Sequence, residues 1–199
     1  MTSPVTPNEF RNRWQTAHPD CPPTGYMLRS QYRERWVRVH SLPDSRRYPE
    51  SENDCQTLLH RHNAVLSELA ERDASVILIS TGYSDTAVAD RNSSELHHLD
   101  PDASYWHTIA KHVIDNDEEY PNYWHFFMSQ HSWQPGIFDA MLRLVADNTV
   151  ANMMIADPQL DWIFHPYDGG ADIILPSEDR RDSLKSQFRN WLSARSDGL

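Results

Sequence analysis

Five residues whose side chains could bind or react lie in one short stretch near the C-terminal end: Trp162, His165, Tyr167, Asp168 and Asp172. A histidine with two carboxylates on adjacent strands could act as a general acid or base. Aromatic side chains that point outward could instead anchor a protein partner. The simplest interpretation is a core hairpin in which a hydrogen-bonded histidine lies beside a turn aspartate.

The stretch that carries these residues predicts a β-hairpin. Asp168-Gly169 lies between two apolar runs, and this pair favours a type I′ turn because glycine adopts the required positive φ easily. A further apolar run at 149–156 precedes the hairpin. Residues 149–176 are therefore expected to form a three-stranded antiparallel meander.

The rest of the chain must supply a scaffold for this hairpin. Apolar residues from Cys55 to Leu69 recur with helical spacing, and Ser75–Ser80 is a short, mainly β-branched run typical of a buried strand. The other expected elements are strands at 36–40 and 123–133 and a helix at 104–115. We predict an α+β domain with a mostly antiparallel sheet of five or six strands, packed against three main helices. Those helices are expected at 52–72, 135–147 and 177–195.

The N-terminal region differs in composition from the remainder. Thr6-Pro7-Asn8-Glu9 is a capping box with proline at the first helical position, and three prolines lie within residues 18–25. We expect residues 1–33 to form an N-terminal helix and a proline-rich extension. Residues 34–199 are expected to form a single α+β domain.

Charge and composition restrict the partners of the protein. The formal net charge is -11, so an acidic surface should repel phosphate backbones, and nucleic acid is not an expected partner. A basic protein partner fits this charge. The N-terminus lacks the apolar core of a signal peptide, and no apolar run is long enough to span a bilayer, so a cytoplasmic protein without a membrane partner is expected.

Several other kinds of site find no support in the sequence. The eleven histidines do not fall at a recognised ligand spacing, and neither HExxH nor CxxC occurs, so no metal is expected. The nucleophile pattern GxSxG is also absent. Gly169-Gly170 lies between strands, not before a helix, so the sequence predicts neither a phosphate loop nor a cofactor.

Two segments of the chain carry a resemblance to known proteins. The segment Trp162-Ile-Phe-His-Pro-Tyr-Asp-Gly-Gly-Ala-Asp-Ile173 is followed by an amphipathic helix with Trp191-Leu-Ser near its end. Together with Arg38–Tyr48, it resembles a family of bacterial proteins of unknown function, over residues 34–199. The resemblance implies the fold and supplies no activity. Some small acidic bacterial proteins act as immunity proteins, and for this chain that role is only an analogy.

Two hypotheses follow. The first is a non-catalytic protein-binding module, immunity-type or regulatory, with an exposed aromatic and acidic patch near the hairpin. The second is a small hydrolase-like or metal-assisted enzyme that uses His165 with Asp168 or Asp172. The second requires these side chains to converge in a concave pocket with perturbed pKa values. The sequence does not decide whether the protein is an enzyme.

Overall fold

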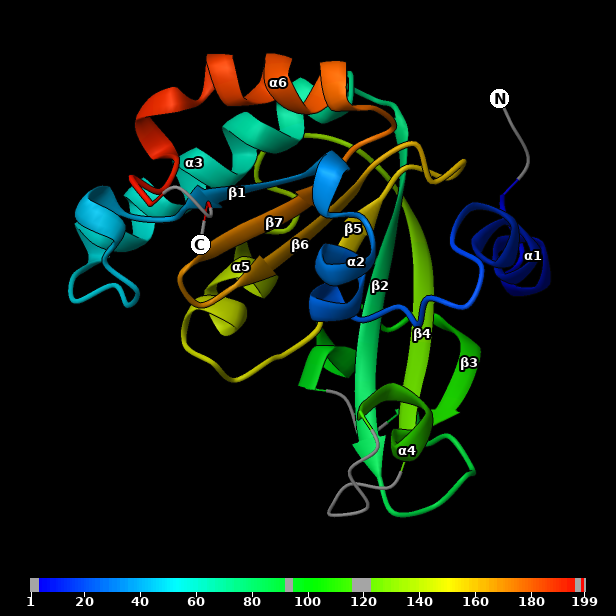
Figure 1. Ribbon diagram of the computed structural model, residues 1–199. Helices are drawn as coiled ribbons and strands as arrows, with labels where there is room; N and C mark the ends of the chain where they lie inside the picture. The colour runs from blue at the N-terminus through cyan, green and yellow to red at the C-terminus, as the bar shows by residue number, and fades with distance from the viewer. Residues whose placement is uncertain (1–3, 92–94, 116–122, 196–197, 199) are drawn as a thin grey trace.

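One antiparallel sheet organises the described chain, with the strand order β1-β7-β6-β5-β2-β4-β3 (Figure 1). The computed structural model describes residues 4–91, 95–115, 123–195 and 198. The strands are β1 (Trp36–His40), β2 (Ser75–Ser84), β3 (Ser104–Ala110), β4 (Tyr123–Ser132), β5 (Met154–Ala156), β6 (Ile163–Tyr167) and β7 (Gly170–Ile174). The α-helices are α1 (Pro7–Ala17), α2 (Gly25–Gln31), α3 (Glu52–Leu69), α4 (Lys111–Asp115), α5 (Asp139–Ala146) and α6 (Glu178–Gln187). Short 3-10 helices lie at Arg33–Arg35, Pro43–Ser45, Glu95–His98 and Arg189–Trp191.

The predicted α+β architecture is confirmed, although the described residues form a sheet of seven strands where five or six were expected. Helices α3, α5 and α6 contribute to the larger apolar core on one face of the sheet, as expected. Their buried leucines Leu58, Leu142 and Leu184 belong to the same core as Phe164 and Ile173 of the hairpin. The C-terminal meander β5-β6-β7 is also present.

Helices α1 and α2 lie on the opposite face, with α2 in front of the sheet in the view of Figure 1. Phe10 and Trp14 of α1 and Leu28 of α2 join a second core with Ile77 and Phe126 of the sheet. The expected capping box at the start of α1 is present. Its threonine accepts a hydrogen bond from the Glu9 backbone, and the glutamate side chain accepts from the threonine backbone.

The helix expected at 104–115 is wrong. Residues 104–110 form the edge strand β3, and only Lys111–Asp115 is helical. The segment is rich in aromatic and β-branched residues, which favour strands, and pairing with β4 decides the outcome. A bulge at Trp106 interrupts the pairing register, so the apolar spacing mimics that of a helix.

Other elements are also shorter than expected, two of them for a local reason. The helix predicted at 52–72, for example, ends at Leu69. The strand predicted at 149–156 is confined to β5, after Asn148 and Asn152, which both have positive φ. The helix predicted from 135 begins at Asp139, because Gly136 has a φ of 93°. The last helix ends at Gln187 and continues only as the 3-10 helix Arg189–Trp191.

Candidate functional site

The β6–β7 hairpin is confirmed, but its predicted turn type is wrong. Tyr167 pairs with Gly170, so Asp168 and Gly169 form a two-residue connection. A type I′ turn requires positive φ at both connecting residues, and neither has it. Glycine is required at position 170 and not at position 169. A Cβ on Gly170 would lie only 2.2 Å from the carbonyl oxygen of Val39. Gly170 therefore allows β1 to pack closely against the hairpin.

Register places three ionisable side chains in one row across the sheet. Arg38 of β1 lies opposite Asp172 of β7, which in turn lies opposite His165 of β6. Side chains alternate along strands, so each member of the row points to the same face as the residue two positions away. Those neighbours include Trp36 and Ile163, which belong to the core beneath α1 and α2. The row therefore faces the α1–α2 side.

Asp172 is buried, and both of its carboxylate oxygens are engaged. Oδ1 accepts hydrogen bonds from Trp36 Nε1 at 2.9 Å and from Arg38 Nε at 2.8 Å. Oδ2 accepts from Arg38 Nη2 at 2.9 Å, and Arg29 Nη1 of α2 lies 3.6 Å away. The bidentate contact with Arg38 is a strong geometry for an arginine–carboxylate pair. Asp172 thus holds β1, β7 and α2 together.

Asp168 in the turn is also buried and paired. Its Oδ2 lies 2.8 Å from Nε of Arg47, which reaches it from the loop after β1. The side chain of Arg47 is 64% exposed, whereas that of Asp168 is 7% exposed. The arginine therefore shields the carboxylate from solvent.

His165 is held neutral beside these charges. Burial lowers its pKa to about 4, an effect that Asp172 opposes and that Arg29 and Arg38 reinforce. Its ring packs on the start of α2, where a Cβ on Gly25 would come within 2.2 Å of Nδ1. This nitrogen is buried without a hydrogen-bond partner. Within the described residues, no hydrogen bond joins the imidazole to either aspartate.

The five predicted residues do not all converge. His165, Tyr167 and Asp172 share the α1–α2 side, and Asp168 lies at the turn beside them. Trp162 belongs to the core on the opposite face. Trp162, Asp168 and Asp172 are only 8%, 7% and 4% exposed, so these three residues do not form the exposed aromatic and acidic patch that the binding hypothesis expects.

A cavity of about 320 Å³ lies beside the hairpin, and we refer to it as the hairpin pocket. His165, Tyr167 and Asp168 line it together with residues from α2, β2, β4 and the loop before β5. Its aromatic lining consists of Tyr26, Tyr83, Trp124 and Tyr167, and Arg47, Asn148 and Asn152 are its other polar residues.

The aromatic walls of the hairpin pocket are held in fixed contacts. The rings of Tyr83 and Trp124 meet edge to face, with centroids 5.0 Å apart. The guanidinium of Arg38 lies 4.8 Å from the ring centre of Tyr167, and burial raises the pKa of that phenol. The sequence predicted the strand that carries Trp124 but gave no sign that Tyr26, Tyr83 and Arg47 line the same pocket. Only the strand register and the position of α2 bring these residues to the hairpin.

The described residues show neither a metal-binding cluster nor a membrane-spanning helix. No cluster of three or more His, Cys, Asp and Glu side chains is placed to hold a metal ion in that part of the chain. None of its helices is long and apolar enough to cross a membrane.

Comparison with known proteins gives a family match. The family model named Domain of unknown function (DUF3885) matches residues 24–196, which include the whole sheet and all helices except α1. None of the curated proteins and none of the solved structures matches the sequence.

Proposed function

Since the chain belongs to the DUF3885 family, a domain family of unknown function, we propose from the geometry of the site that it is a non-catalytic protein-binding module of the immunity or regulatory type. Its partner is a basic protein that binds at the hairpin pocket.

The observation that carries this proposal is the pairing of the hairpin carboxylates. A carboxylate that acts as a base, or that orients a histidine, needs an oxygen directed at the reacting group. Both oxygens of Asp172 already accept hydrogen bonds from Trp36 and Arg38, and Asp168 is paired with Arg47. This pairing favours a structural role for both aspartates.

The lining of the hairpin pocket supports a role in recognition. Aromatic side chains and arginine are the residue types that anchor protein interfaces. Tyr26 is 40% exposed and Arg47 lies at the surface, so a partner can reach them. The Arg47–Asp168 pair and the neutral His165 leave the lining without net charge, whereas the whole chain carries -11. The surrounding acidic field would attract a basic partner.

Site-specific photo-cross-linking tests this proposal. Tyr26 is replaced by p-benzoylphenylalanine, and the protein is irradiated with an extract of its native host at low and at high salt. The matched control carries the same group in place of Ile137, which is 42% exposed and does not line the pocket. We expect one basic protein to cross-link from position 26, not from position 137, and less at high salt. Trp124→Leu should weaken the cross-link, and its melting midpoint is measured as a check on folding because Trp124 also packs against the core.

The opposite outcomes are equally clear. Equal cross-linking from both positions, or none from position 26, would refute the binding proposal. In that case, turnover of ester or phosphate substrates that His165→Ala abolishes would establish the hydrolase-like alternative, in which His165 acts with Asp168 or Asp172.

A further inference from the structure

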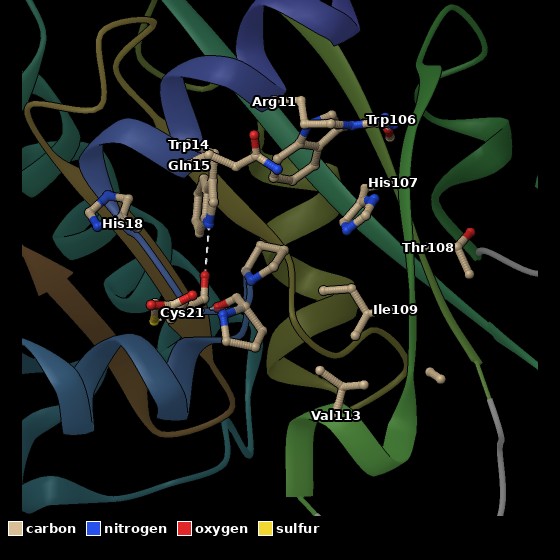
Figure 2. A pocket seen from close by; sticks show the side chains of 14 residues that line it. Arg11, Trp14, Gln15, His18, Cys21, Trp106, His107, Thr108, Ile109 and Val113 are labelled. Carbon is tan, nitrogen blue, oxygen red and sulfur yellow. Dashed lines mark hydrogen bonds between the residues drawn. The ribbon is translucent and has the colours of Figure 1, made fainter.

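A second cavity, of about 590 Å³, lies between α1, the loop that follows it and the edge strand β3 (Figure 2). We refer to it as the α1–β3 cavity. Its volume lies within the usual range of small-molecule sites. In Figure 2, Arg11, Gln15 and Trp106 lie at one end and Ile109 and Val113 at the other.

The walls of this cavity are mainly apolar, and two indole rings form part of them. The indole rings of Trp14 and Trp106 lie 5.4 Å apart between centroids, and Pro22 and Ile109 continue the apolar lining. The Nε1 group of Trp14 donates a hydrogen bond of 2.8 Å to the carbonyl oxygen of Cys21, which fixes that indole at the wall. Such walls suit a planar apolar molecule.

The lining of the cavity carries one charge of each sign, from Arg11 and from the exposed Asp20, and no ion pair joins the two among the described residues. The guanidinium donates from Nη2 to the carbonyl oxygen of Trp106, and its Nε is buried without a partner. No carboxylate of the described residues forms an ion pair with it. Burial and the nearby guanidinium lower the pKa of His107, which also lines the cavity, so this imidazole is neutral at pH 7. A half-buried arginine without a counter-charge can bind an anion through its N–H donors.

From this arrangement we propose that the α1–β3 cavity binds a small planar carboxylate. The carboxylate pairs with Arg11, and the apolar body lies against Trp14, Trp106 and Ile109. Arg11 and Trp14 precede the residues that match the family, 24–196, so the family match does not imply this site. The site is also independent of the hairpin pocket, with which it shares no lining residue.

A matched ligand pair tests the charge requirement. Binding of 1-naphthoate and of its neutral counterpart 1-naphthamide is measured by calorimetry on the full chain. We expect one molecule of naphthoate per chain, bound about tenfold or more tighter than the amide, as a hydrogen bond to a charged group implies. Naphthoate should also quench the fluorescence of Trp14 and Trp106.

Variants of α1 then assign the charge to one residue. Arg11→Met should reduce naphthoate affinity to that of naphthamide, and Arg11→Lys should retain part of the difference. The matched control is Arg13→Met, because Arg13 lies on the same helix but donates to Pro158 and does not line the cavity. Equal binding of the two ligands by the wild type, or the same loss in both methionine variants, would overturn the proposal. Failure of naphthoate to bind would also overturn it.

Discussion

The row formed by Arg38, Asp172 and His165 and the α1–β3 cavity each place a charged side chain on the α1–α2 side of the sheet. Asp172 accepts three hydrogen bonds from Trp36 and Arg38 and has Arg29 nearby as well. Arg11 has only a backbone carbonyl as its partner. Asp172 therefore has two arginine side chains close to its carboxylate. Arg11, in contrast, has no counter-charge among the described residues.

This difference separates a structural charge from one available to a ligand. A buried charge that the fold already pairs contributes to the position of its neighbours, and an incoming group would have to displace them. A half-buried charge without a counter-charge can pair with an incoming ion. The residues that look most reactive in the sequence, Asp168 and Asp172, are of the first kind.

Removal of the hairpin carboxylate should have the largest effect. Asp172→Ala removes the bidentate partner of the nearly buried Arg38 and the acceptor of the Trp36 indole, so we expect a loss of about 3–5 kcal/mol in the free energy of unfolding. Chemical denaturation measures it. Asp161→Ala, at an exposed turn, is the control and should change stability by less than about 0.5 kcal/mol. Similar values for both variants would mean that the Asp172 network does not stabilise the fold.

Acid should weaken both regions through their buried histidines. Burial lowers the pKa of His165 beside the hairpin, of His18 beside the cavity and of His62 in the core to about 4, from an ordinary 6.5. The unfolded chain then binds protons that the folded chain does not, so stability falls as the pH drops from 6.5 towards 4 and is unaffected above that range. Each histidine should contribute about 3 kcal/mol to this loss.

Urea unfolding at a series of pH values tests the histidine prediction. His62→Gln should flatten the pH dependence by close to one proton. A pH dependence that survives replacement of all three buried histidines would contradict their assigned role.

The two hairpin glycines should differ by a smaller amount. In Gly170→Ala the new methyl group meets the backbone of Val39 at 2.2 Å, so β1 must shift, at about 1–3 kcal/mol. In Gly169→Ala the nearest atoms belong to the side chains of Tyr167 and Arg47, at 3.1 and 3.3 Å, and the expected loss is below about 1 kcal/mol. Thermal melts of the two variants compare them directly. A larger loss of stability in Gly169→Ala than in Gly170→Ala would instead support the type I′ turn.

Loss of the cavity arginine should affect stability least. Arg11→Met removes one hydrogen bond to the Trp106 carbonyl and no ion pair within the described chain, so we expect at most about 1 kcal/mol. The same denaturation experiment applies, with Asp172→Ala as the reference. A loss as large as that of Asp172→Ala would show that Arg11 is a structural charge too.

Local patterns in the sequence predicted most of the scaffold. Helix α3 follows from its continuous apolar face, and the hairpin follows from Asp168-Gly169 between two apolar runs. The error at β3 has a different origin, because aromatic residues spaced around a bulge can satisfy either period. Pairing with β4 decides the outcome, and a distant strand is not visible in a local window.

The surroundings of the candidate residues could not be predicted in the same way. Asp172 was singled out from its position beside the turn, yet its partners Trp36, Arg38 and Arg29 are more than a hundred residues away in the sequence. The α1–β3 cavity likewise depends on how α1 lies against an edge strand that was expected to be a helix. Residue types indicate which groups can react, and the tertiary register determines which of them remain available.

The pairing of β1 with β7 has a consequence for the synthesis of the protein. Trp36 pairs with Ile174, so strands from nearly opposite ends of the chain lie side by side (Figure 1). Strands β2 and β3 both pair with β4, and all three are complete once Ser132 has been made. On the ribosome, β1 emerges before the other strands, whereas β7, with which it pairs, emerges last. Val37 and Val39 therefore stay exposed until the hairpin has been made. Chaperones that recognise apolar strands would encounter this segment during translation.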